Sequence, residues 1–186
     1  RGAHLRAARG ARDGGGAASG GTAFGAQVRA GGLRLKVTGL PLSPATDAAT
    51  AGLHTEATFT QTKKPTHPEA YGLFIAGKNL NDSTFSYTYF ITRGDGKFMI
   101  RNMVGGKTTT VADWTENAAL VKEDAAGKAT NKLEILVGKD GKVTFSANGK
   151  EVHSMTAAPD AMAGVVGLRV NHNLDVHVAG FVVHKL

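Results

Sequence analysis

The segment NHNLDVH, residues 171–177, gathers polar side chains that could bind a ligand. Side chains alternate between the two faces of an extended strand, so one face would carry Asn171, Asn173, Asp175 and His177. These groups could hydrogen-bond the hydroxyls of a sugar or, together with loop carbonyls, ligate calcium. The same Asn-His-Asn sequence is also typical of a turn in which the amides cap backbone groups. The sequence leaves both interpretations open.

A second kind of binding chemistry would come from aromatic side chains. The C–H faces of pyranose rings stack on flat rings, and Trp and Tyr combine an apolar body with a polar tip. We predict this role for Trp114 or Tyr87; Tyr87 shares a strand face with Tyr89. The chain has only eight Phe, three Tyr and one Trp, so most of its aromatic residues are expected in the core.

Acid–base chemistry would centre on the sequence His67-Pro68-Glu69, directly before a predicted strand. A loop histidine beside a carboxylate can transfer protons near neutral pH, because its ordinary pKa is about 6.5. His-Pro is equally an ordinary turn element. The candidate catalytic residues are His67, Glu69, Asp175 and His177.

An oxygen-rich segment offers a separate candidate cation site. Asn79, Asn81 and Asp82 lie in the loop-like sequence KNLND, where their side chains could ligate calcium. The segment lacks the Asp-x-Asp-x-Asp-Gly spacing and the terminal Glu of a calcium-binding loop, and an Asx turn explains the same residues. The sequence contains no motif for another cofactor.

These residues must be positioned by β-strands. Between residues 131 and 155, three alternating runs are separated by Asp140-Gly141 and Asn148-Gly149, which tolerate the positive φ angles of tight hairpin turns. The runs therefore predict an antiparallel meander. Further alternating or apolar runs occupy residues 33–38, 53–61, 70–76, 86–93, 97–103, 107–113, 164–170 and 175–185. About eleven short strands with turn signals between them predict an all-β sandwich of two antiparallel sheets.

The charge is concentrated at the start of the chain. Residues 1–36 hold seven Arg and Lys against Asp13 alone, whereas the net charge of all 186 residues is +7. The rest is therefore close to neutral, which argues against specific nucleic-acid binding. We predict a low-complexity basic arm at residues 1–32 and one domain at residues 33–186. By itself the arm should be disordered on this interpretation, unless its own domain or a neighbouring copy in a homo-oligomer holds it.

The location of the protein is suggested by the ends and composition of the chain. It contains no cysteine and no apolar run long enough to span a membrane, and it begins at Arg1 without methionine. We interpret that start as a processed or partial N-terminus and expect a secreted or periplasmic protein.

Four stretches carry a family resemblance: residues 69–80 (EAYGLFIAGKNL), 89–101 (YFITRGDGKFMIR), 130–154 and 164–183. They resemble concanavalin A-like, laminin G-like jelly rolls and, within that group, secreted bacterial domains related to the 3-keto-disaccharide hydrolase-like family. The resemblance covers residues 33–186 and implies two sheets of five to seven strands, one convex and one concave.

The resemblance also suggests what the protein does. Family 16 glycoside hydrolases of this fold carry a Glu-x-Asp-x-x-Glu strand, which this sequence lacks. We therefore expect a non-catalytic module that binds a carbohydrate or cell-surface polymer. Two alternatives stay open: a glycoside hydrolase-like enzyme acting on keto-sugar glycosides, and a structural subunit of an extracellular assembly.

Overall fold

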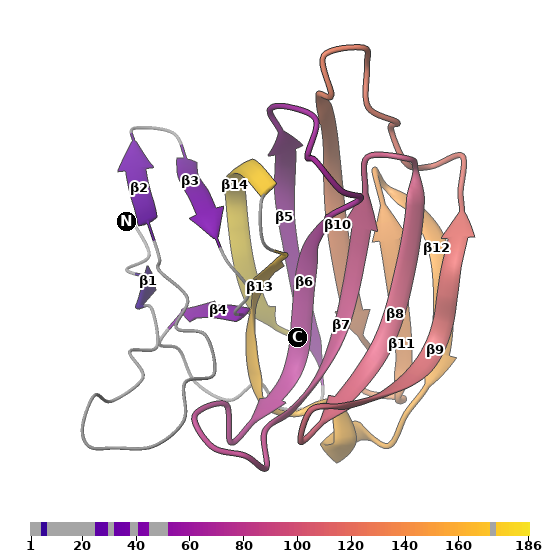
Figure 1. Ribbon diagram of the computed structural model, residues 1–186. Helices are drawn as coiled ribbons and strands as arrows, with labels where there is room; N and C mark the ends of the chain where they lie inside the picture. Colours follow the sequence, from indigo (N-terminus) through magenta and orange to yellow (C-terminus); the bar gives the residue numbers. More distant parts are fainter. Residues whose placement is uncertain (1–4, 7–24, 30–31, 38–40, 45–51, 172–173) are drawn as a thin grey trace, which may run out of the picture.

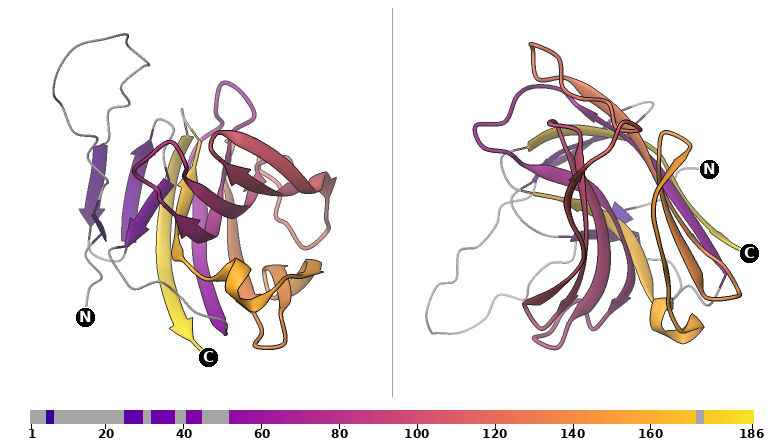
Figure 2. Two further views of the ribbon diagram at one scale, coloured as in Figure 1. Left: turned by 90° about the horizontal axis from the view of Figure 1, so that it is seen from below. Right: turned by 90° about the vertical axis from the view of Figure 1, so that its right-hand side faces the viewer.

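The computed structural model describes residues 5–6, 25–29, 32–37, 41–44, 52–171 and 174–186, the first four ranges by their backbone alone. Two antiparallel sheets of seven strands lie face to face (Figures 1 and 2). This arrangement confirms the predicted all-β sandwich. In the described residues, the helical structure is limited to one 3-10 turn, η1 (Pro159–Met162).

We name each sheet after a central strand. The β7 sheet has the order β1 (Leu5–Arg6), β4 (Pro41–Pro44), β13 (Val165–Val170), β6 (Ala70–Lys78), β7 (Ser86–Arg93), β8 (Lys97–Val104) and β9 (Lys107–Glu116). The β5 sheet has the order β12 (Lys150–Thr156), β11 (Lys142–Ala147), β10 (Ala129–Val137), β5 (Leu53–Gln61), β14 (Leu174–Lys185), β3 (Gly32–Val37) and β2 (Gly25–Arg29).

The predicted meander is confirmed as β10, β11 and β12. β10 pairs with β11, and β11 pairs with β12, all antiparallel. The turns use the backbone freedom that the sequence offered: φ is +83° at Gly141, +52° at Asn148 and +79° at Gly149. Asn148 also caps the end of the hairpin, because its side-chain oxygen accepts the Lys132 N–H at 2.9 Å.

Two short strands lie in the range assigned to the arm. β2 pairs with β3, and β1 pairs with β4, so this chain's own sheets include both segments. β1 and β2 each stand at the edge of a sheet. The boundary at residue 32 stays a prediction.

The core fills the space between the inner faces of the two sheets. Alternation places Leu73 of β6, Phe90 of β7 and Ile100 of β8 in it, all fully buried. The β5 sheet contributes Phe59 and Phe145 among others. Phe90 meets Phe145 edge-on with 5.5 Å between ring centroids, which joins the two sheets through a favourable aromatic pair.

One buried polar residue ties the sheets together. Asn131 of β10 is fully buried, and its side-chain nitrogen donates to the Tyr71 hydroxyl of β6 at 3.2 Å. Burial raises the pKa of Tyr71 to about 12, because the phenolate would lose its hydration; the Asn131 hydrogen bond lowers it by less.

This raised pKa predicts an alkaline loss of stability. In the unfolded chain Tyr71 ionises near pH 10, whereas in the folded protein it stays protonated to about pH 12. Its contribution is fully present below pH 10 and falls by about 3 kcal/mol as the pH rises to 12. Urea unfolding of the wild type and Tyr71→Phe at pH 9, 10, 11 and 12 checks this. The unfolding free energy of the wild type should fall relative to that of Tyr71→Phe over this range; a constant difference would contradict the assignment.

Candidate functional site

The outer face of the β7 sheet carries a second apolar cluster, separate from the core. The strands that send Leu73 and Phe90 inward send the intervening residues outward, as alternation requires. We call this surface the aromatic face. Its residues are Ala70, Phe74, Leu80, Phe85, Tyr87, Tyr89, Ile91, Met99, Met103, Trp114 and Val165.

Arginine side chains lie over the rings of the aromatic face. The guanidinium carbon of Arg169 is 4.4 Å from the Tyr89 ring centroid, and that of Arg93 is 4.2 Å from the Trp114 ring centroid. Both distances are in the range of cation–π contacts. The surface is thus built as aromatic rings with planar cations on top of them.

The strand order explains how Arg169 reaches the tyrosines. Arg169 of β13 lies opposite Gly72 of β6, and Gly72 in turn lies opposite Ile91 of β7. Because Gly72 has no side chain, the arginine can cross β6 and contact β7. Its Nη1 donates to the Tyr87 hydroxyl at 3.4 Å.

Arg169 and burial shift the pKa of Tyr87 in opposite directions. Burial raises the pKa of the Tyr87 phenol, while the positive charge of Arg169 lowers it by less. Tyr87 therefore stays a neutral hydroxyl at physiological pH. A neutral hydroxyl beside a guanidinium can exchange hydrogen bonds with a polar ligand.

The two predicted stacking residues, Trp114 and Tyr87, both lie on this face. Trp114 is partly exposed, and Arg93 occupies one side of its ring. Tyr87 is only 6% exposed, because its ring packs among Phe74, Phe85 and Tyr89. Trp114 is thus the more accessible ring, and Tyr87 presents mainly its hydroxyl. Their role toward a ligand stays a prediction.

The structure describes part of the polar group predicted at residues 171–177. Leu174 and Val176 of β14 are buried, so Asp175 and His177 lie on the outer face of the β5 sheet, away from the aromatic face. Asn171 precedes β14, and its backbone N–H donates to the carbonyl of Ala70. Asn173 lies outside the described residues.

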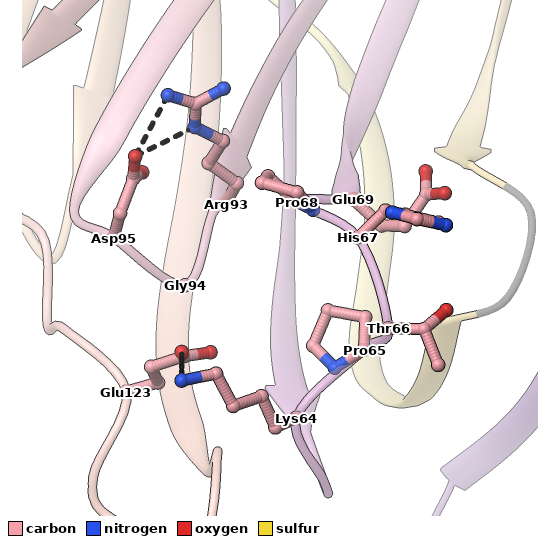
Figure 3. Close-up of a pocket in the computed structure, with 10 residues that line it drawn as sticks. All are labelled: Lys64, Pro65, Thr66, His67, Pro68, Glu69, Arg93, Gly94, Asp95 and Glu123. Atoms are coloured by element: carbon pink, nitrogen blue, oxygen red, sulfur yellow. Dashed lines mark hydrogen bonds and ion pairs between the residues drawn. The ribbon is translucent and has the colours of Figure 1, made fainter.

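His67 and Glu69 line a pocket at the end of the sandwich, with a volume of about 170 Å³ (Figure 3). Residues 64–69, residues 93–95 and Glu123 form its walls. Asp175 and His177, the other two candidate catalytic residues, are not among the residues that line it. The structure therefore brings together one half of the predicted acid–base group and leaves the other half on the β5 sheet.

The carboxylates around this pocket are those of Glu69, Asp95 and Glu123. Asp95 pairs with Arg93 at 2.8 Å. Glu123 accepts a hydrogen bond from Gln61 at 2.8 Å and lies 3.6 Å from the Lys64 ammonium. Glu69 is 5% exposed. The protein itself thus already compensates the charges of Asp95 and Glu123.

The candidate calcium segment forms the turn between β6 and β7. One oxygen of Asp82 accepts hydrogen bonds from the backbone N–H of Thr84 at 2.7 Å and from its hydroxyl at 2.5 Å. These bonds lower the pKa of the Asp82 carboxyl. Asn79 has φ +52° and donates to the same hydroxyl at 3.0 Å. These hydrogen bonds have the geometry of an Asx turn. Calcium binding by Asn79, Asn81 and Asp82 stays a prediction.

The structure also gathers residues that sequence reasoning missed. On the outer face of the β5 sheet, Nε2 of His54 lies 3.5 Å from Glu134 and 3.7 Å from Glu56, a grouping that could hold a metal ion. His184 stacks on His54 with 5.8 Å between ring centroids. Lys132 lies 2.6 Å from Glu56, so a cation would have to displace it. Only the strand pairing brings these residues together.

Comparisons with known proteins identify the type of fold. No family model matches the sequence, and no curated protein matches it. The structure is similar to the carbohydrate-binding module CBM66 from Bacillus subtilis, with a TM-score of 0.65 and 10% identity over 89% of this chain and 94% of that one. It is also similar to a protein of unknown function with a galectin-like fold from Bacillus subtilis, with a TM-score of 0.61 and 15% identity over 88% of each chain.

A third similar structure is a β-glucanase from Bacillus licheniformis, with a TM-score of 0.56 and 11% identity over 83% of this chain and 78% of that one. Within the described residues, no helix has the length and apolar character needed to cross a bilayer. The relation to the 3-keto-disaccharide hydrolase-like family stays a prediction. The fold itself is the predicted concanavalin A-like jelly roll.

Proposed function

We propose that the protein is a secreted, non-catalytic module that binds a carbohydrate or cell-surface polymer along the aromatic face. The observation that supports this most is the layer of guanidinium groups on aromatic rings, with Arg93 on Trp114 and Arg169 on Tyr89. Flat rings stack on sugars, and guanidinium groups hydrogen-bond their oxygens. The fold alone would not support the proposal, because one fold hosts many functions.

Replacing Trp114 tests the proposal. We expect Trp114→Ala to weaken polysaccharide binding by about tenfold to a hundredfold, because a partly exposed ring of the face is lost. Calorimetry with a panel of neutral and acidic polysaccharides measures this, and thermal melting checks that the variant is folded.

Two controls make that experiment specific. Trp114→Phe keeps a ring and should retain most of the affinity. Leu136→Ala removes an exposed apolar side chain from the opposite outer face and should leave binding unchanged. The proposal would be overturned if the wild type bound no polysaccharide of the panel, or if Trp114→Ala and Leu136→Ala lost the same affinity.

A hydrolase-like enzyme acting on keto-sugar glycosides is the second candidate. The supporting observation is that His67 and Glu69 line a pocket that also includes Arg93, whose guanidinium reaches Trp114. Turnover of keto-sugar or aryl glycosides by the wild type, abolished in both His67→Ala and Glu69→Gln, would favour the enzyme. Absence of turnover would favour the binding module.

Self-assembly through residues 1–32 is a further part of the proposal. β1 and β2 stand at sheet edges, and an edge strand can pair with a strand of another copy. Light scattering of the full chain and of a chain lacking residues 1–32 should show an oligomer and a monomer, respectively. Equal masses would remove the role of the arm.

A further inference from the structure

We infer that the aromatic face selects an acidic polysaccharide, and that Arg169 binds the anionic group of the sugar. This inference rests on the proposed function and names its ligand class. It depends on how the charges of the face are paired.

Arg169 is a partly buried cation without a carboxylate partner in the described part of the chain. Its contacts there are the Tyr89 ring and the Tyr87 hydroxyl. Its Nε is buried and, like that of Arg101, has no hydrogen-bond partner among the described residues. Burying a charge is unfavourable unless a counter-charge or hydrogen bonds compensate it, so this arrangement favours an external anion.

Arg93 and Arg101, the latter between Met99 and Met103 on β8, differ from Arg169 because each has a carboxylate partner. Arg93 is held by Asp95 at 2.8 Å. Arg101 lies 3.5 Å from Asp113, a carboxylate that is 75% exposed. These three arginines therefore exceed their two carboxylate partners by one positive charge, and the unmatched charge is that of Arg169.

The chemistry of guanidinium narrows the ligand. Its planar fork of N–H donors matches a carboxylate or a sulfate in a two-point contact, and such charged hydrogen bonds are stronger than neutral ones. The ring of Tyr89 beneath it limits the positions that the fork can adopt. A neutral polysaccharide could stack on Trp114 but would leave the charge of Arg169 unpaired. A polysaccharide with uronate or sulfate groups could stack on Trp114 and also form an ion pair with Arg169.

Matched polymers test the inference. Affinities are measured by calorimetry at 150 mM NaCl for polygalacturonate and its methyl ester, and for dextran sulfate and dextran. We expect at least tenfold tighter binding of the charged member of one pair. A preference for polygalacturonate over its methyl ester would indicate carboxylate recognition. A preference for dextran sulfate over dextran would indicate sulfate recognition.

Variants separate the role of Arg169 from the overall positive charge. Arg169→Ala should weaken binding of the preferred acidic polymer at least tenfold, and Arg169→Lys, which keeps the charge without the fork, should recover only part of it. Lys150→Ala, an equal change of charge at an exposed position of the β5 sheet, should change the affinity less than twofold. Thermal melting confirms that each variant is folded.

The outcomes distinguish this inference from the proposed function. Equal affinities for charged and neutral polymers, with binding still dependent on Trp114, would overturn acid selection and leave the binding module standing. Equal effects of Arg169→Ala and Lys150→Ala would also overturn it. Absence of binding to every polymer would overturn both.

Discussion

Asn131→Leu is expected to lower the free energy of unfolding by about 3 kcal/mol or more. Asn131 is fully buried and uses both ends of its amide. Its oxygen accepts from the Val121 N–H at 2.8 Å and from Asn148 at 2.9 Å, and its nitrogen donates to the Val121 carbonyl at 3.1 Å and to Tyr71 at 3.2 Å. Leucine keeps the branched arrangement of side-chain heavy atoms but cannot hydrogen-bond, so these partners are lost, each costing about 1–3 kcal/mol where it stays buried. Its larger methyl groups also crowd the packed core.

Urea unfolding measures this loss, and a second asparagine provides the control. Asn102 is partly exposed, and its side-chain oxygen accepts a hydrogen bond from the Thr88 hydroxyl. Asn102→Leu deprives one partner of its hydrogen bond instead of four, the buried Thr88 hydroxyl, and should cost about 1 kcal/mol. Similar losses for Asn131→Leu and Asn102→Leu would contradict the view that the Asn131 network joins the two sheets.

Gly127→Ala is expected to be at least as damaging. Gly127 has φ +78°, and an added Cβ would lie 2.0 Å from the backbone nitrogen of Lys64. The loop would have to move, which would disturb the 2.7 Å hydrogen bond from Gln61 to the Gly127 carbonyl. Strain from the positive φ adds about 1–2 kcal/mol, so we expect a total loss of about 4 kcal/mol.

Gly149→Ala is the matched control for Gly127→Ala. Gly149 has a nearly identical φ of +79°, but an added Cβ would meet no atom within 4 Å. It should therefore show only the conformational strain, about 1–2 kcal/mol. Thermal melting should place Gly127→Ala about 5 °C or more below Gly149→Ala. Equal melting temperatures would show that the close approach to Lys64 does not constrain the fold.

The strands could be predicted because side-chain alternation is a local property. β5 and β7 have the predicted bounds, and β5 shows the strict alternation of buried and partly buried residues that its sequence indicated. The strand β4, with the sequence PLSP, is absent from the predicted strands. Proline removes a backbone donor and argues against a strand, so local rules miss an element that tertiary pairing forms.

The candidate site could be predicted only in part. Residue type identifies Trp114 and Tyr87 but not Arg169, because 82 positions separate Arg169 from Tyr87 and the order of β13, β6 and β7 brings the two together. Within the NHNLDVH segment, alternation places Asp175 and His177 together on β14, which begins at Leu174, and a single polar face for the whole segment stays a prediction. Pairing between distant strands is tertiary information that spacing along the chain does not carry.

The most direct test of the central claim is a nuclear magnetic resonance titration with oligogalacturonate. The chain has one tryptophan, so the indole N–H of Trp114 gives a single signal. If the aromatic face binds the sugar, that signal and the backbone amides of β13, β6, β7, β8 and β9 should shift together. Shifts confined to the β5 sheet or to the loop at residues 64–69 would contradict the claim.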